Sequence, residues 1–349
     1  LPYLSADLPG IGGRLRSSIE DFQVEEIPAY LPSGEGDHIY AWVEKREMTT
    51  AVLIRDIARQ LEIRESDIGA AGMKDKYAVT RQMLSIPPPT TPEQVMALEL
   101  AGATILSAGR HGNKLRTGHL KGNRFVLRVR RLDCPVDEAV ERTQAILDVM
   151  AKVPGAPNWY GAQRFGRAGD NSRVGKALVT QTKTSGKTPR GRQRRLYISA
   201  YQSQLFNDYL EARLRDNLYS TVVEGDVLQK RDSGGMFVSE DVATEQGRFD
   251  QGELSLTGPM FGHRMKCPSP DSPAEDRESS ILKREEIELQ SFAHLSKLAT
   301  GTRRPLSVLL EGAEVKALDQ AVEVRFTLPS GSYATAIMRE IMKGENFPN

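Results

Sequence analysis

The chain contains 349 residues, of which 39% are hydrophobic and 27% charged, and its formal net charge at pH 7 is only +1. At roughly 150 residues per domain, this length predicts a globular protein of two or three domains. The composition excludes a collagen-like or wholly disordered chain, and no segment approaches the ~20 consecutive apolar residues of a membrane-spanning helix.

The first 150 residues are predicted to mix strands and helices. Residues 37–45 alternate as a strand does, with Ile39, Ala41 and Val43 on one face. Thr49 or Thr50 can cap the helix that follows. The other elements expected in this part are strands at 102–108 and 124–130 and helices at 50–61, 92–100 and 136–152.

The sequence pattern changes after about residue 153 and returns near the C-terminus. The middle part is expected to contain a basic loop at 183–195, a helix at 200–215, a loop at 266–278 and a long helix at 279–299. A strand at 321–329 then precedes a helix that begins at Ser330 or Ser332 and ends near Lys343. Strands at both ends around a different middle predict one discontinuous domain that is interrupted by an insertion.

Basic residues gather in two stretches although the total charge is balanced. Residues 110–131 contain eight Lys and Arg and no acid, and residues 183–195 contain six and no acid. Such segregation favours a face that binds a polyanion, with two ordinary solvated faces as the alternative. In the strand at 124–130, apolar residues alternate with arginines, which predicts one buried and one arginine-lined face.

Cysteine and histidine residues give no sign of a metal site or a disulfide framework. Cys134 and Cys267 form no Cys-x-x-Cys pair, and the five histidines show no metal-ligand spacing. The first residues lack the basic segment and the apolar core of a signal peptide. Together these features predict a cytoplasmic protein.

The sequence contains no complete nucleotide-binding or hydrolase motif of the common types. SGKT at 185–188 resembles the end of a phosphate-binding loop, but Gln181 stands where that loop needs glycine. GIGG at 10–13 lacks the strand, turn and helix of a dinucleotide-binding motif. Neither G-x-S-x-G nor H-E-x-x-H occurs, which argues against serine and zinc hydrolases.

The segment GMKDKYAVTRQ at 72–82 places a carboxylate between two lysines in a turn that begins with glycine. Lys74 and Lys76 are expected to stabilise the ionised form of Asp75, and an ionised carboxylate on a short turn is a candidate nucleophile. A surface turn whose charges cancel is the alternative that the spacing leaves open.

Three more segments hold candidate site residues. Residues 110–125 offer cations that could follow phosphates, and Asn123 offers an amide that could read a base edge. Phe22 lies in the segment DFQVEE, and Tyr333 stands at the start of the last helix. Each segment also fits an ordinary role, as a basic hairpin, a core phenylalanine or a helix cap.

In this order the segments resemble the TruD family of transfer-RNA pseudouridine synthases. Residues 72–82 match the family motif G-x-K-D-K-x-A-V-T-x-Q throughout, and residues 110–125 match R-H-x-x-K-L-R-x-G-x-L-K-G-N-x-F. PNWYGAQRFGRAGDN at 157–171 and LPSGSYATAIMRE at 328–340 match two further family segments. The likeness extends over most of the chain.

The resemblance implies an α+β fold, in which a family-specific α/β TRUD domain is inserted into a pseudouridine synthase catalytic domain with a mixed sheet flanked by helices. Placed on this sequence, the catalytic domain comprises residues 1–153 and 303–349, and the insertion comprises residues 154–302. The implied activity is the isomerisation of uridine 13 in the D arm of tRNA, without a cofactor or metal. We expect a monomer whose partner is tRNA, with no membrane attachment.

The resemblance also implies roles for individual residues. By matched position, Asp75 is the catalytic aspartate and Phe22, Asn123 and Tyr333 contact the substrate. Phe125 matches an aromatic residue that could form a wall of the pocket. Aromatic faces would stack on the flipped uracil, and the amide would hydrogen-bond to it.

Further contacts are expected from position alone. Arg339 is expected to supply a buried positive charge to Asp75. The stretches 110–131 and 183–195 are expected to contact phosphates, so that added salt weakens binding. Two other functions stay open, a catalytically silent RNA-binding or tRNA-chaperone protein on the same scaffold and a metal-dependent nuclease.

Overall fold

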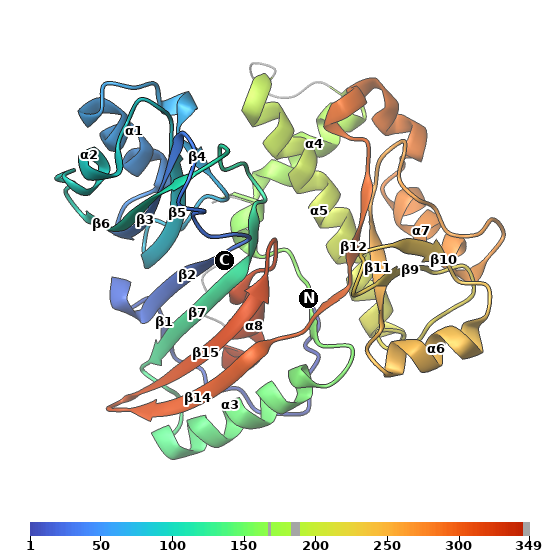
Figure 1. The fold of residues 1–349 in the computed structure, drawn as a ribbon. Helices are drawn as coiled ribbons and strands as arrows, with labels where there is room; N and C mark the ends of the chain where they lie inside the picture. The colour runs from blue at the N-terminus through green and yellow to red at the C-terminus, as the bar shows by residue number, and fades with distance from the viewer. Residues whose placement is uncertain (167–168, 183–188, 345–349) are drawn as a thin grey trace.

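A computed structural model describes residues 1–166, 169–182 and 189–344, which form one nine-stranded sheet, one four-stranded sheet and one two-stranded pair (Figure 1). The helices are α1 (Thr50–Gln60), α2 (Pro92–Met96), α3 (Val136–Ala151), α4 (Asp170–Val179), α5 (Gly191–Arg215), α6 (Val242–Asp250), α7 (Pro273–Arg284) and α8 (Ala334–Met342). The strands are β1 (Arg14–Leu15), β2 (Phe22–Pro28), β3 (His38–Arg46), β4 (Gly69–Ala70), β5 (Val79–Ile86), β6 (Ala103–His111), β7 (Leu120–Arg130), β8 (Ala156–Pro157), β9 (Val227–Lys230), β10 (Met236–Val238), β11 (Leu254–Met260), β12 (Thr302–Pro305), β13 (Ser307–Val308), β14 (Glu311–Leu318) and β15 (Ala321–Pro329).

The nine-stranded sheet is mixed, in the order β14-β15-β7-β2-β5-β3-β6, with β1 beside β7 and β4 beside β5. β2 and β5 run parallel, whereas β7 runs antiparallel to both of its long neighbours. Phe125, Leu127 and Val129 of β7 are buried, and Phe125 lies opposite Phe326 of β15 with ring centroids 5.6 Å apart. The alternation predicted for strand 124–130 is thus confirmed.

Helices cover two parts of this sheet. Leu147 of α3 and Ile341 of α8 belong to one buried cluster with residues of β2, β7 and β15. Leu53 and Ile57 of α1 belong to a second cluster, with β3 and β5. The helix begins where the sequence predicts, because the side chain of Thr49 accepts a 3.2 Å hydrogen bond from the Val52 N–H and so satisfies a free donor of the first turn.

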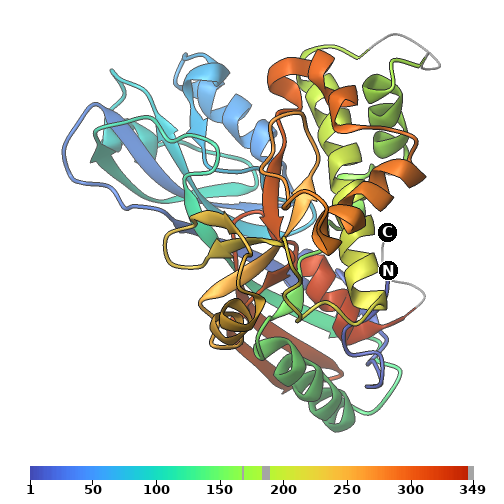
Figure 2. The ribbon, with the colours of Figure 1, turned by 90° about the vertical axis from the view of Figure 1, so that its right-hand side faces the viewer.

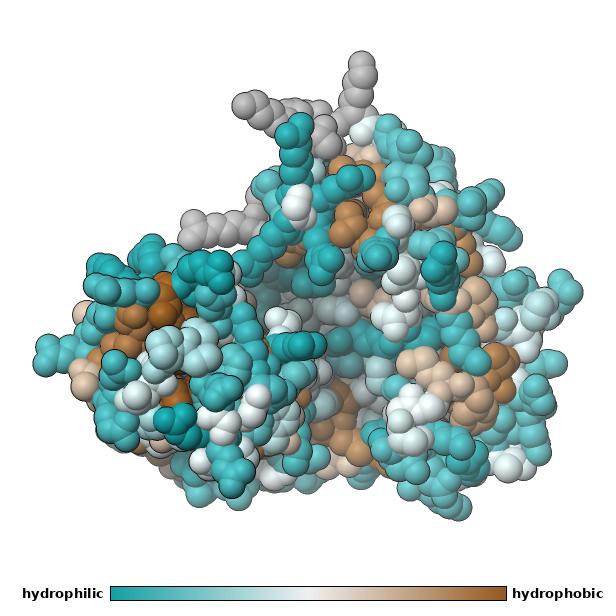
Figure 3. Space-filling model, turned by 45° about the horizontal axis from the view of Figure 1, so that its top comes forward, coloured by the Kyte–Doolittle hydropathy of each residue, from teal (hydrophilic) through white to brown (hydrophobic). Residues whose placement is uncertain are grey.

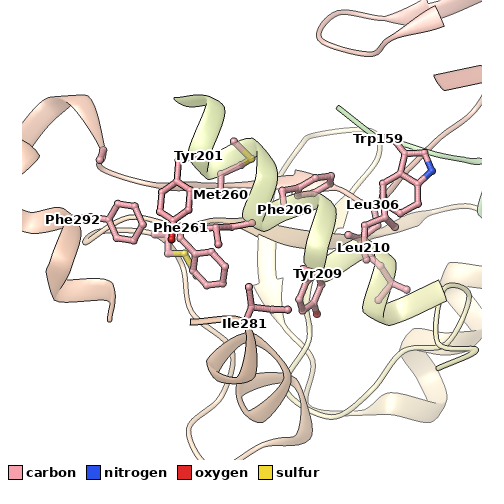
Figure 4. Close-up of a cluster of buried hydrophobic side chains, with 14 of the residues drawn as sticks. Trp159, Tyr201, Phe206, Tyr209, Leu210, Met260, Phe261, Ile281, Phe292 and Leu306 are labelled. Atoms are coloured by element: carbon pink, nitrogen blue, oxygen red, sulfur yellow. The ribbon is translucent and has the colours of Figure 1, made fainter. Parts of the chain in front are cut away.

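The four-stranded sheet, in the order β10-β9-β11-β12, packs against the long helix α5 and has its own core. Figure 4 shows this core, in which rings of α5 meet side chains of β11 and of the segments that follow it, with the labelled residues Trp159, Tyr201, Phe206, Tyr209, Leu210, Met260, Phe261, Ile281, Phe292 and Leu306. A Cβ on Gly258 would lie 2.7 Å from a Leu306 methyl carbon and 2.9 Å from the Phe206 ring. Glycine therefore allows α5 to approach β11 closely.

The chain passes between the two sheets through a short antiparallel pair. β8 leads into the segment with the smaller sheet and β13 leads out of it, and Ala156 pairs with Val308. In Figure 2 the part with the smaller sheet faces the viewer. The boundaries expected at 153/154 and 302/303 stay a prediction; β12, which pairs with β11 in the smaller sheet, crosses the second of them.

The prediction of a helix over residues 279–299 was wrong. α7 already begins at Pro273, within the predicted loop, and it ends at Arg284. Glu286 then has a positive φ of 56°, and a separate 3-10 segment, Leu289–Leu298, contains Ser296 at φ 50°. A positive φ cannot continue a right-handed helix, so the apolar periodicity alone overestimated its length.

Other boundaries also differ from the predictions. The last helix is capped by Tyr333 without a side-chain hydrogen bond, not by Ser330 or Ser332. The edge strand β14 was not predicted, although Ala313 and Val315 alternate with charged residues; most of its residues are exposed. Of the predicted basic loop, residues 191–195 form the first turn of α5, and residues 183–188 lie outside the described residues. No helix in the described part of the chain is long and apolar enough to cross a membrane.

A buried ion pair joins α5 to the smaller sheet and allows a stability test. Arg213 is fully buried, and its Nη1 and Nη2 bind the Asp226 carboxylate at 2.9 to 3.2 Å. In Asp226→Asn the buried cation loses its counter-charge, so we expect the free energy of unfolding to fall by about 3 kcal/mol.

Denaturant unfolding followed by the fluorescence of Trp159, which lies in the same core, measures this change. The exposed Asp250 provides the control, because Asp250→Asn should cost less than about 0.5 kcal/mol. Equal losses in the two variants would contradict the prediction.

Candidate active site

Asp75 lies in the turn that joins β4 to β5, and hydrogen bonds from neighbouring elements fix this turn. Lys45 of β3 is fully buried, and its Nζ donates to the backbone oxygens of Asp75 at 2.7 Å and Met48 at 2.6 Å. Thr50 Oγ1 accepts a 2.9 Å hydrogen bond from the backbone N–H of Lys74. The backbone is therefore held on both sides of the Asp75 side chain.

The carboxylate of Asp75 forms an ion pair with Arg16. Arg16 Nη2 lies 3.2 Å from Asp75 Oδ2, and the Asp75 side chain is 41% exposed. The guanidinium carbon of Arg16 also lies 3.9 Å from the centroid of the Phe22 ring, within the range of a cation–π contact. Arg16 thus orients the carboxylate while it packs on an aromatic wall of the site.

The flanking lysine Lys74 pairs with a different carboxylate than expected. Its Nζ lies 2.9 Å from Glu26 Oε2, and both side chains are nearly inaccessible to solvent. The same Nζ donates to Asn123 Oδ1 at 2.7 Å. Because an ammonium group can only donate, the amide oxygen of Asn123 must face Lys74, and its NH₂ group stays available for another partner.

One cavity of about 230 Å³ brings together all five residues that the sequence singled out. Phe22 of β2 and Phe125 of β7 are buried walls, and the half-buried Asn123 of β7 and Tyr333 line the cavity together with Asp75. The surface is hollowed between the part that carries the nine-stranded sheet and the part that carries the four-stranded sheet (Figure 3). The roles of the five residues stay predictions, but their proximity is a finding.

Residues from the smaller-sheet part hold the Tyr333 side of the cavity. Arg304 of β12 donates to the backbone oxygen of Gly331 at 3.0 Å, and its guanidinium lies 4.2 Å from the centroid of the Tyr160 ring. Tyr160 in turn meets Tyr333 edge to face, at 5.7 Å between centroids. Burial raises the pKa of the Tyr333 hydroxyl, so this group is neutral near pH 7.

The predicted pairing of Arg339 with Asp75 was wrong. Arg339 donates to the backbone oxygen of Pro2, and its guanidinium lies 4.0 Å from the Tyr3 ring centroid. The first residues of the chain therefore bind the Arg339 guanidinium. The ion pair with Asp75 that was predicted for Arg339 is formed by Arg16 instead.

The basic stretch at 110–131 is only partly available to phosphates. Three of its arginines bind carboxylates of this sheet or of the 3-10 turn before β2, through the pairs Arg124–Glu25, Arg128–Glu323 and Arg130–Asp21. The arginine-lined face that the sequence predicts is therefore largely neutralised within the protein.

Within residues 1–166, 169–182 and 189–344, no group of three or more His, Cys, Asp or Glu side chains is arranged to hold a metal ion. The absence of a cofactor stays a prediction.

A mixed sheet presents an aspartate beside a small cavity whose walls are aromatic rings and one amide, an arrangement that suits an enzyme with a carboxylate nucleophile and an unstacked base as substrate. The sequence profile of the TruD family, described as tRNA pseudouridine synthase D, matches residues 1–186 and 187–341. The chain therefore belongs to the TruD family, whose reaction is the isomerisation of uridine in tRNA.

Individual relatives agree with this assignment. A tRNA pseudouridine synthase D of Anaeromyxobacter dehalogenans strain 2CP-1 is 46% identical over 348 residues, which cover 99% of this chain and 97% of that protein. The protein of the same name from Thermus thermophilus is 42% identical over 344 residues, which cover 99% and 92%. The crystal structure of a Methanosarcina mazei protein assigned to tRNA pseudouridine synthase D superposes with a TM-score of 0.77, at 25% identity, over 98% of this chain and 96% of that one.

Lys45 provides a measurable signature of the charge on Asp75. Burial lowers the pKa of Lys45 to about 8, the negative charge of Asp75 raises it, and the charge of Lys74 lowers it further. Removal of the Asp75 charge in Asp75→Asn should therefore lower the pKa of Lys45 below its native value.

The chemical shift of the Lys45 Cε, followed by NMR across a pH titration, reports this pKa. Asp67→Asn is the matched control, because Asp67 is paired with Arg64 and is not among the charges that act on Lys45. A Lys45 pKa that is unchanged or higher in Asp75→Asn would contradict the described geometry.

Proposed function

We propose that this chain converts uridine 13 in the D arm of tRNA to pseudouridine, with Asp75 as the nucleophile and without a cofactor. The observation that carries the proposal is the single cavity in which Asp75 lies with Phe22, Phe125, Asn123 and Tyr333. Membership of the TruD family supports the choice of a tRNA substrate.

The size and walls of the cavity fit a single extruded base. Its volume of about 230 Å³ lies below the roughly 300–1,000 Å³ of sites for drug-sized ligands. A uridine inside folded RNA must leave its stack to reach Asp75, and aromatic faces compensate for the stacking that it loses. Phe22, Phe125 and Tyr333 supply such faces.

The chemistry needs an ionised carboxylate but no redox or metal partner. Asp75 either attacks C1′ and forms a bond to it that breaks again when C5 bonds to C1′, or takes a proton from C2′ to give a glycal and later returns that proton. On both routes the N1–C1′ bond breaks. The uracil then turns and C5 forms the new bond to C1′. C5 loses a proton and N1 takes one up, so that substrate and product are isomers.

Neighbouring residues position the reacting groups. Arg16 holds the Asp75 side chain in place through a 3.2 Å ion pair. Lys74 fixes the amide oxygen of Asn123, so the Asn123 NH₂ group can donate to a carbonyl oxygen of uracil. The base is thereby held by one directional contact and by stacking.

The proposal includes the organisation of the whole chain. Residues 1–153 and 303–349 form the catalytic domain, and residues 154–302 form an inserted domain that completes the tRNA-binding cleft. We propose a monomeric cytoplasmic enzyme, a location that is supported by the two free thiols, Cys134 and Cys267, and by the tRNA substrate.

Replacement of Asp75 tests the nucleophile. Asp75→Asn should abolish the release of tritium from tRNA that contains 5-tritiated uridine, because the amide cannot act as the nucleophile. Binding of the same tRNA, measured by fluorescence anisotropy, should stay within about fivefold of the native affinity, since one exposed ion pair is worth at most about 1 kcal/mol.

This experiment also separates the other two functions. A silent RNA-binding protein would release no tritium even with Asp75 intact. A metal-dependent nuclease would shorten the RNA and lose activity with a chelator. Tritium release by Asp75→Asn would show that another group is the nucleophile.

Tyr333 tests the importance of the aromatic face. Tyr333→Ala removes the ring and should lower kcat/KM by about 10-fold or more, in line with the roughly 1–3 kcal/mol of a base–aromatic stack. Tyr333→Phe keeps the ring and should retain most of the activity in the same tritium-release assay. An equal loss in both variants would mean that the hydroxyl group, not the face, is required.

A further inference from the structure

A larger cavity adjoins the candidate active site and has no role in the isomerisation described above. It has a volume of about 850 Å³ and is lined by residues 13–19 together with Tyr77, Arg131, Asp133 and Gly344. We refer to it as the flanking groove. Arg16 lines this groove and also binds Asp75, which lines the active-site cavity, so the Arg16–Asp75 ion pair links the two.

Tyr77 presents an uncovered ring to the groove. It is 53% exposed, which is unusual for a large aromatic side chain, and Nζ of Lys76 lies 5.1 Å from the centroid of its ring. Tyr77 follows Asp75 by two residues, so the two Cα atoms lie at most about 7 Å apart. The matched family motif leaves this position open and gives the ring no role.

The charge of the flanking groove suits a phosphate. Arg14 and Arg131 are both exposed, and neither forms an ion pair with another described residue. Asp133 is the acidic residue among the groove-lining side chains, and Arg14, Arg16 and Arg131 outnumber it. This differs from Arg124, Arg128 and Arg130, which are neutralised by carboxylates.

We propose that the flanking groove binds the nucleotide next to the target uridine, with its base stacked on Tyr77 and its phosphate beside Arg14 and Arg131. The proposal rests on the proposed function, since it places the uridine at Asp75. A flipped uridine stays joined to its neighbours by phosphodiester bonds, and Arg16, which contacts Asp75 and lines the groove, leads from the uridine to the groove. Stacking on an exposed ring holds that neighbour without a strong preference for its base.

Binding of a D-arm stem-loop RNA to chains that carry Asp75→Asn tests the stack without turnover. Tyr77→Ala should raise Kd about 10-fold, and Tyr77→Phe should restore most of the affinity. Tyr77→Leu, which keeps apolar volume but no ring face, should resemble Tyr77→Ala. If Tyr77→Ala leaves Kd unchanged, or if Tyr77→Leu binds as well as Tyr77→Phe, the stacking proposal is overturned.

An RNA that lacks one base separates stacking from a structural effect of the substitution. Three stem-loops are compared, one intact, one abasic on the 5′ side of the target and one abasic on its 3′ side. In one of the abasic RNAs the penalty of Tyr77→Ala should fall from about 10-fold to nearly none, because the stacking partner is absent. A penalty that is the same for all three RNAs would overturn the proposal.

The salt dependence of binding tests the phosphate contact. Arg131→Ala should reduce the slope of log Kobs against log salt concentration by about 0.7 to 0.9, as expected for one lost phosphate contact. Arg215→Ala is the control, because Arg215 is exposed but lies on α5 and is paired with Glu211. An unchanged slope in Arg131→Ala would remove Arg131 from the interface.

Tritium release tests the proposed reaction, and RNA binding by the Tyr77 variants tests the flanking groove, so the two proposals can fail independently. If the native chain releases no tritium from tRNA, the assignment of the reaction to this site fails, whatever the binding measurements on the Tyr77 variants show. If tritium is released but the penalty of Tyr77→Ala is the same for the intact and the abasic RNAs, the isomerase assignment holds and only the flanking groove loses its role.

Discussion

The geometry of the site depends on the burial of two lysines beneath one short turn. Lys45 binds the backbone oxygen of Asp75, and Lys74 binds Glu26 and the amide of Asn123. A buried ammonium group without partners would be very unfavourable, so each lysine restricts the conformations that the turn can adopt. The carboxylate is thus presented by a rigid segment although it is itself half exposed, and a nucleophile has to be preorganised in this way.

The alternating strands could be predicted from the sequence, but the partners of their polar residues could not. Lys45 follows Val43 on the buried face of β3, and Glu26 follows Val24 on the buried face of β2. The alternation therefore marks both as buried charges, which is a signal that the sequence analysis passed over. Which group each one meets is decided by strand pairing between distant segments, and no local pattern contains that information.

The same limit explains which site residues were found. Asp75, Asn123 and Tyr333 lie in long motifs and were identified by resemblance, whereas Arg16 lies in a short connection without any motif and was missed. Arg339 was assigned wrongly because α8 turns this side chain toward residues 1–3, which are distant in sequence. Arg304 could not be foreseen, since its role depends on how the smaller-sheet part meets the loop before α8.

The balance of charge at the site fits a reaction in which a base leaves as an anion. Arg16, Lys45 and Lys74 carry three positive charges near neutral pH, and Asp75 and Glu26 carry two negative charges, which leaves one net positive charge. Breaking the N1–C1′ bond moves an electron pair onto the uracil, and fixed positive charge and amide donors stabilise such developing charge at little reorganisation cost. Burial lowers the pKa of Lys45 to about 8, so the ammonium group is still protonated near neutral pH and contributes its positive charge to this balance.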